Sequence, residues 1–328
     1  MDQLHQDTIT ELRKHIGDAS ILTLRCPLDH GKHDATPHDD ATLGSLCALP
    51  TELRHLVFSF LDIRSLLVFR RVSKLAMSLV NAMTEYHKVV TNTPDALRMA
   101  IAIRVHHQYT ISELFDALCT RKCADCGTLT QYLDVFRLRR VCLSLNGFCQ
   151  GLRPSVQVSA EHRRFRILRP IMEQIYGNVD AALDRLPTFT PIPGRYSAER
   201  RFGHGGVGFH DNLTTSFLCF DPNGVPQFEA ALSVHTATTF RTTAELNGIM
   251  RKSMSLVIAP WLDSKNMGSA SGVQCSICAH TYDIKRKSCQ ARTDTKEGWE
   301  EIMNLKICEL WPEEGLAEHM RDAHGAEL

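Results

Sequence analysis

Residues 46–80, LCALPTELRHLVFSFLDIRSLLVFRRVSKLAMSLV, predict three short helices in succession. In the first helix, apolar side chains recur at the i, i+3, i+4 and i+7 spacing of one helical face, at Leu53, Leu56, Val57 and Phe60. Three helices of this size bury too little apolar surface to be stable alone, because domains below about 40 residues usually need help. The unit must therefore pack on the rest of the chain, on a partner, or on both.

Local signals mark where several elements begin. Asp62 and Ser73 are good N-caps for the second and third helices, and Thr93-Pro94-Asp95 predicts the start of a further helix. Ser112 is the expected cap of a helix that runs through Leu118. Short strands are predicted at 215–220, 228–234 and 254–261.

The helical unit resembles an F-box. The resemblance lies in Leu49-Pro50-Thr51-Glu52-Leu53, in the apolar spacing through Phe60-Leu61-Asp62, and in Arg71-Val72-Ser73-Lys74. In that family the three helices dock on a small Skp-type adaptor, which joins a cullin–RING ubiquitin ligase. The resemblance implies adaptor contacts at Leu49, Pro50, Leu53, Val57, Leu61 and Leu66.

The chain is expected to be an α+β protein in three parts. Residues 1–45 are expected to form a flexible N-terminal extension, because 27–45 carry few apolar side chains and cannot build a core. Residues 46–90 form the expected three-helix F-box. Residues 91–328 are expected to form a mixed, helix-rich receptor domain with one or two small zinc-knuckle sites.

Composition excludes several classes of function. Of 328 residues, 43% are hydrophobic and 23% charged, which is typical of a globular chain. Lys plus Arg and Asp plus Glu both number 37, so the chain lacks the basic excess that drives binding to nucleic acid. No run approaches the ~18 apolar residues of a spanning helix, and no secretory signal is recognised at the start. We therefore expect no nucleic acid and no membrane as partner, and a location in the cytoplasm, the nucleus or both.

Nine of the twelve cysteines gather in two clusters, and the first lies at 119–149. Clustered cysteines in a reducing compartment indicate metal binding rather than disulfides. A C-x-x-C knuckle can place two thiolates on one zinc ion. The expected ligands are Cys123, Cys126, Cys142 and Cys149, with Cys119 as the alternative fourth ligand. Plain thiols or a redox pair are the competing interpretations.

The second cluster, at 275–324, combines a knuckle with a histidine-bearing helix. Its expected zinc ligands are Cys275, Cys278, His319 and His324, with Cys289, Cys308 and His280 as possible substitutes. A DNA-reading finger has about 12 residues between its Cys and His pairs. Here 40 residues separate the two pairs, and the helix is acidic. The pattern therefore indicates a zinc-stapled end of the fold, although a solvated terminal helix without metal is the alternative.

A wider resemblance links the chain to fungal F-box proteins. It rests on short motifs: Pro260-Trp261-Leu262-Asp263, Gly272-Val273-Gln274-Cys275, the knuckle at 123–127 and Pro193-Gly194-Arg195-Tyr196. The resemblance implies an architecture, an F-box followed by a region with Cys and His, and leaves the target open.

The sequence thus predicts a non-catalytic substrate receptor of an SCF-type ubiquitin ligase that recruits an unknown protein. Gly203-His204-Gly205-Gly206 is similar to half of a lipase oxyanion loop, but no nucleophile elbow accompanies it. No catalytic residue is expected. The alternative is a zinc-stabilised nucleic-acid or transcription-linked binding protein, and a zinc hydrolase is a third possibility.

Overall fold

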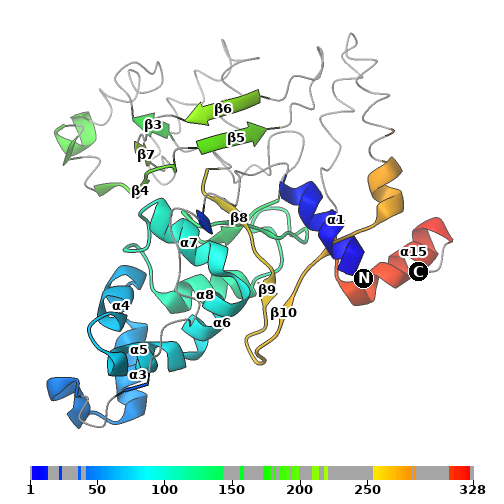
Figure 1. The fold of residues 1–328 in the computed structure, drawn as a ribbon. Helices are drawn as coiled ribbons and strands as arrows, with labels where there is room; N and C mark the ends of the chain where they lie inside the picture. Colours follow the sequence, from blue (N-terminus) through cyan, green and yellow to red (C-terminus); the bar gives the residue numbers. More distant parts are fainter. Residues whose placement is uncertain are drawn as a thin grey trace.

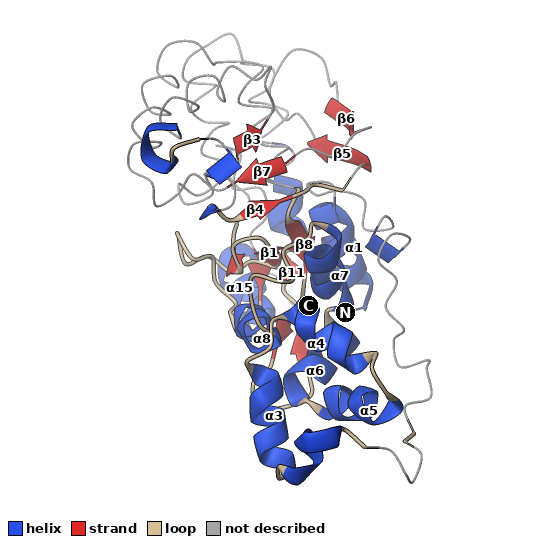
Figure 2. Cartoon of the chain, turned by 90° about the vertical axis from the view of Figure 1, so that its left-hand side faces the viewer, coloured by secondary structure: helices blue, strands red, loops and turns tan. Residues whose placement is uncertain are grey.

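The fold was analysed in a computed structural model. It describes residues 2–13, 22–23, 36–37, 42–142, 156–158, 173–178, 180–181, 185–192, 194–198, 209–213, 218–220, 254–281, 284 and 310–325. Helices dominate the first half of this described part and small antiparallel sheets the second half, so the predicted α+β class is confirmed. The short helices at 51–82 lie at one end of the molecule, and the strands between 156 and 220 lie at the other (Figures 1 and 2).

The first helical part has four short elements. They are η1 (Gly44–Ala48), α3 (Thr51–Ser59), α4 (Ile63–Arg70) and α5 (Lys74–Ala82). The predicted caps are confirmed, because the Asp62 carboxylate accepts the Ser65 N–H and the Ser73 hydroxyl accepts the Ala76 N–H. Each cap satisfies an N–H group that has no partner inside its own helix.

Three more helices complete the helical half. They are α6 (Thr84–Asn92), α7 (Pro94–Ala102) and α8 (Ile111–Cys119). Pro94 occupies the first turn of α7, as predicted. The cap predicted at Ser112 is wrong. Thr110 caps α8 through a capping box in which its hydroxyl accepts the Glu113 N–H and the Glu113 carboxylate accepts the Thr110 N–H.

The helices on both sides of residue 90 share one hydrophobic core. This core includes Phe58 and Val80 from the first helical part and Leu97, Leu114 and Leu262 from later elements. The start of α4 is also tied to the loop between α7 and α8. The N–H groups of Ile63 and Arg64 donate to the carbonyls of Tyr109 and His106, at 3.0 and 2.9 Å. The first helical part is therefore fixed to the rest of the body and does not hang from a linker.

A three-stranded antiparallel sheet packs under α7 and α8. Its strands, in spatial order, are β2 (Arg139–Arg140), β1 (Tyr132–Asp134) and β8 (Leu256–Ile258). Arg140 is fully buried, and its guanidinium donates to five backbone carbonyls, those of Leu118, Thr120, Gln131, Ala259 and Pro260. This one side chain joins the end of α8 to two strands, because every donor of the fork finds an acceptor.

The remaining strands form four small antiparallel sheets. They are β3 (Val156–Val158) and β4 (Thr188–Phe189) on either side of β7 (Leu218–Phe220), β5 (Gly194–Ala198) with β6 (Phe209–Leu213), β9 (Trp261–Leu262) with β10 (Ser269–Ala270), and β11 (Val273–Gln274) with β12 (Leu310–Trp311). The strands predicted at 215–220 and 254–261 correspond to β7 and β8. The segment 228–234 lies outside the described residues.

The two ends of the chain pack together. Helix α1 (Asp2–Arg13) lies beside α15 (Glu313–His324), and both views place the termini close to each other (Figures 1 and 2). Leu12 is fully buried, and Leu22 belongs to the main core. Part of the segment expected as a flexible extension is therefore packed, because the apolar side chains before residue 27 find partners far away in the sequence. None of the described helices is long and apolar enough to cross a membrane.

Candidate metal centres and apolar surface

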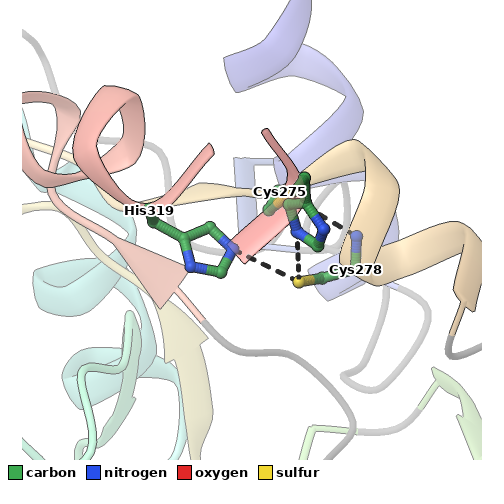
Figure 3. Close-up of side chains that lie close together, drawn as sticks. Cys275, Cys278 and His319 are labelled. Carbon is green, nitrogen blue, oxygen red and sulfur yellow. Dashed lines mark hydrogen bonds between the residues drawn. The ribbon is translucent and has the colours of Figure 1, made fainter. Parts of the chain in front are cut away.

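Two cysteines and two histidines meet where the last described helix returns to the body. Cys275 and Cys278 stand at the start of a helical turn, and His319 and His324 project from α15. Both histidine Nε2 atoms lie 3.3 Å from the Cys278 Sγ, and the four donor atoms lie within 4.8 Å of one another. Figure 3 shows Cys275, Cys278 and His319 converging. The group could hold a metal ion, because two thiolates and two imidazoles form a tetrahedral zinc set.

The strand pair β11–β12 closes the 40-residue gap between the two ligand pairs. Val273 pairs with Trp311, so Cys275 emerges from one strand just where α15 follows the other. The Trp311 ring stacks on the His319 ring, with centroids 4.0 Å apart and planes 17° from parallel. The Cys275 thiol is buried and lies 3.3 Å from the Met320 sulfur. The pairing thus places ligands that are distant in the sequence on one point.

Three cysteines of the first cluster also meet. The donor atoms of Cys123, Cys126 and Cys142 lie within 4.8 Å of one another, and the last two sulfurs are 3.4 Å apart. The knuckle is closed by hydrogen bonds from the Gly127 N–H to the Cys123 carbonyl and from the Cys123 N–H to the Thr128 carbonyl. Gly127 has a φ of 74°, a left-handed conformation that glycine adopts without strain. The turn therefore holds two thiols beside a third from the end of β2.

The surroundings of Cys123 favour its thiolate. Hydrogen bonding with the Cys142 side chain lowers the pKa of the Cys123 thiol to about 4, with help from the N–H groups of Cys126 and Asp125 and in spite of its burial. Because the thiolate is the form that binds metal, the site is prepared for a cation.

The other proposed ligands divide into two groups. Cys119 and His280 are described but do not join either group of donor atoms. Burial raises the pKa of the Cys119 thiol, and the nearby Asp116 carboxylate raises it further, which disfavours the thiolate that a metal needs. Cys149, Cys289 and Cys308 lie outside the described residues. Among the residues that the structure describes, the first group therefore consists of three cysteines.

The apolar face predicted on α3 points to solvent. Phe60 is 76% exposed, whereas Phe58, two residues earlier, is 1% exposed and packs against Phe69 with ring centroids 4.6 Å apart. Two more exposed apolar side chains follow, Val68 on α4 and Val72 in the turn after it. Together they form what we call the exposed apolar set: Leu53, Leu56, Val57, Phe60, Val68 and Val72. Large apolar side chains exposed together in so short a segment are typical of a surface that binds a partner.

The adaptor contacts implied by the resemblance fall into three classes of exposure. Pro50, Leu53 and Val57 are exposed, and Leu49 and Leu61 are partly buried. Leu66 is fully buried in the core and is not part of the exposed surface, and the implied contacts stay a prediction. Helix α4 turns Leu66, together with Ile63, toward the body.

The periodicity placed Leu56 and Phe60 on the same helical face as Leu53 and Val57, but the contacts that the resemblance implies include neither of them, nor Val68 or Val72. The sequence did contain a sign of these exposed residues, because the segment around α3 has more apolar side chains than the helix buries. In the structure, Phe58 is the buried residue of α3.

Comparison with known proteins supports the assignment of the helical part. A family model of the F-box domain matches residues 46–88, so this part of the chain is an F-box domain. The match covers α3, α4, α5 and the first half of α6 and ends at Lys88. No curated protein and no solved structure matches the chain. The likeness to fungal F-box proteins outside 46–88 therefore stays a prediction.

Proposed function

We propose that the protein is a substrate-receptor subunit of an SCF-type cullin–RING ubiquitin ligase. The observation that carries the proposal is the exposed apolar set on an F-box domain, because F-box helices typically bind a Skp-type adaptor and this set is the apolar surface that such an adaptor would cover. A standard interface removes about 800 Å² from each partner. Six large side chains on neighbouring turns can supply the apolar centre of an interface of that size.

The receptor contributes proximity and no chemistry of its own. Once the adaptor is bound, the shared core between the F-box and the later helices would hold a recruited target at a fixed distance from the ubiquitin carrier. Ubiquitin transfer itself would belong to the ligase partners. The recruiting surface lies in the region after residue 91, and such a receptor would act in the cytoplasm, the nucleus or both.

We also propose that both Cys/His groups bind structural zinc. Cys275, Cys278, His319 and His324 would hold one ion with four protein ligands, which leaves no open position for catalysis. Cys123, Cys126 and Cys142 would hold the second, with Cys149 as the fourth ligand. When bound, zinc acts here as a crosslink between segments that are far apart in the sequence.

Adaptor capture tests the main proposal. Replacing both Leu53 and Val57 by Asp places two charges in the proposed interface, where a buried unpaired charge costs several kcal/mol. The double variant should lose capture of a purified Skp-type adaptor, while its melting temperature stays near that of the wild type because both side chains are exposed. Met267→Asp makes the same change at an exposed apolar residue outside the F-box and should bind normally. Retained capture by the double variant would refute the F-box surface as the adaptor site.

Elemental analysis tests the zinc proposal. Freshly purified protein should contain close to two zinc ions per chain, and Cys278→Ser and Cys126→Ser should each lower this number by about one. Asp263→Asn serves as a control in an exposed turn outside both groups. If elemental analysis finds no zinc in freshly purified protein, the cysteines are plain thiols.

A further inference from the structure

Helix α1 presents one face to the C-terminal metal group. Leu4, Thr8 and Leu12 recur at i, i+4 and i+8, which places them on a single stripe of the helix. Thr8 and Leu12 are buried and Leu4 is partly buried, whereas Gln6 and Thr10 on other faces are exposed. The end of the helix is also held by the main body, because the Tyr132 hydroxyl of β1 donates to the Leu12 carbonyl at 2.9 Å.

Beneath the first turns of α1 lies the frame of the metal group itself. The Thr8 hydroxyl accepts the Gln274 N–H at 3.0 Å, one residue before Cys275. His5 Nε2 hydrogen-bonds to the Glu313 carboxylate at 2.9 Å, in the first turn of the helix that carries both histidines. Leu4 packs on a small hydrophobic cluster, which consists of Val273, Cys275, Leu316 and Met320. Two members of that cluster flank or supply the metal donors.

The described part of this frame buries little apolar surface. Among the residues that the structure describes, its cluster has four buried members and is separate from the main core, whose members run from Leu22 to Leu262. Small modules with so little buried apolar surface need a metal, a disulfide or a neighbour to be stable. Here the metal ligands join α15 to the knuckle, and α1 covers the cluster from outside. The two supports act on the same few residues.

We infer that docking of α1 and metal binding by Cys275, Cys278, His319 and His324 are thermodynamically coupled. Metal holds the surface on which α1 docks, and docked α1 in turn raises the affinity for metal, since such coupling is reciprocal. Loss of the metal then loosens the docking of the N-terminal helix, beginning with its first turns. The inference rests on the zinc site of the proposed function and does not depend on adaptor binding.

Metal removal from the full-length wild-type protein tests one direction of the coupling. After treatment with a strong chelator, amide hydrogen exchange across 2–13 should accelerate at least tenfold, together with that of 313–324. Exchange across α6 should stay unchanged, because its residues pack in the main core. Adding zinc back should restore protection of 2–13. Cys278→Ser should reproduce the effect without chelator, whereas Cys126→Ser, in the first group, should leave 2–13 protected.

Zinc titration of α1 variants tests the other direction. Leu4→Asp with Leu12→Asp should weaken one of the two zinc sites by about tenfold in competition with a colorimetric chelator, within the range usual for allosteric coupling. Gln6→Asp with Thr10→Asp adds the same charges to the exposed faces and should leave both affinities unchanged. If the first double variant fails to fold, Thr8→Val should still weaken the same site, because it removes the hydroxyl that accepts the Gln274 N–H and donates to the Leu4 carbonyl.

The outcomes separate the inference from the zinc assignment. Protein that binds zinc but keeps residues 2–13 protected after its removal overturns the inference and leaves the assignment intact. Equal zinc affinities in both double variants overturn it as well. Protein that contains no zinc refutes the assignment, and the inference with it. Loss of adaptor capture in the Leu53 and Val57 variant bears on neither.

Discussion

Substitution of two phenylalanines in one short segment should separate the effect on adaptor binding from the effect on folding stability. Phe60 is 76% exposed and Phe58 is 1% exposed, although only one residue lies between them. We expect Phe60→Ala to weaken adaptor binding without changing stability, and Phe58→Ala to do the reverse. The pair is well matched, because the same atoms are removed from neighbouring positions of the same F-box.

The size of the binding effect follows from the exposed area. A phenylalanine side chain buries about 200 Å² when fully covered, so Phe60 offers a partner roughly 150 Å². At about 25 cal/mol per Å² this area is worth roughly 4 kcal/mol at most. Ordering the side chain at the interface costs about 1 kcal/mol. The remainder, about 3 kcal/mol, corresponds to a roughly 100-fold increase in Kd.

The size of the folding effect follows from burial. Phe58 packs on Phe69 inside the main core, and truncation of a buried phenylalanine to alanine costs about 3–5 kcal/mol through lost contacts and a cavity. Such a loss is a large share of the 5–15 kcal/mol that stabilises a typical domain. Phe58→Ala should therefore lower the melting temperature clearly, and the fraction that remains folded should bind the adaptor with normal affinity.

Calorimetric titration with a purified Skp-type adaptor and thermal melting of each variant measure both effects. An affinity of Phe60→Ala within threefold of the wild type would show that the exposed face of α3 is not the adaptor site. A fall in melting temperature as large as that of Phe58→Ala would instead show that Phe60 is packed in solution.

Three further predictions concern the body of the protein. In Gly272→Ala the new Cβ would lie 2.9 Å from the Trp261 ring and 3.0 Å from the Leu310 Cβ. Thermal melting should therefore show that the free energy of unfolding falls by about 1–3 kcal/mol. Arg140→Met leaves buried carbonyls without their hydrogen-bond donor, at a cost of roughly 1–3 kcal/mol for each unsatisfied group. Urea unfolding should show that the free energy of unfolding falls by something on the order of 5 kcal/mol. Arg140→Lys should partly restore it. Burial, followed by repulsion from neighbouring positive charge, lowers the pKa of His106 below its usual 6.5. The unfolded chain then binds more protons at that site, so its contribution to stability is complete above pH 6.5 and is lost as the pH falls through the lower, folded pKa. Between pH 7.5 and pH 5.5, the free energy of unfolding measured in urea should therefore fall less for His106→Gln than for the wild type. Equal falls in the two proteins would contradict this.

Much of the local structure could be predicted from the sequence. The caps at Asp62 and Ser73, the start of α7 at Pro94 and the knuckle before Gly127 depend on hydrogen bonds and dihedral angles within a few residues. Where a local rule failed, as at Thr110, another local rule applied, because the capping box offers two hydrogen bonds where a single cap offers one.

Exposure could not be predicted in the same way. The periodic face of α3 looks like a core face in the sequence, yet the single off-face residue Phe58 anchors the helix and the periodic face is exposed. Conversely, Leu66 belongs to a motif that implied a contact and is buried. Periodicity shows which side chains share a face, and only the packing of the other helices decides whether that face is covered inside the chain or left for a partner.

For the candidate metal centres the sequence alone determined the donors, and the tertiary structure decided which of them meet. Spacing identified the two knuckles, and the pairing of β11 with β12 was needed to bring α15 to Cys275 across 40 residues. Nothing in the local sequence of α1 indicated that Thr8 would bond to Gln274, 266 residues away. Residue types and short-range geometry are encoded locally, whereas contacts between distant segments depend on the free energy of the whole packed core, which no short window of sequence contains.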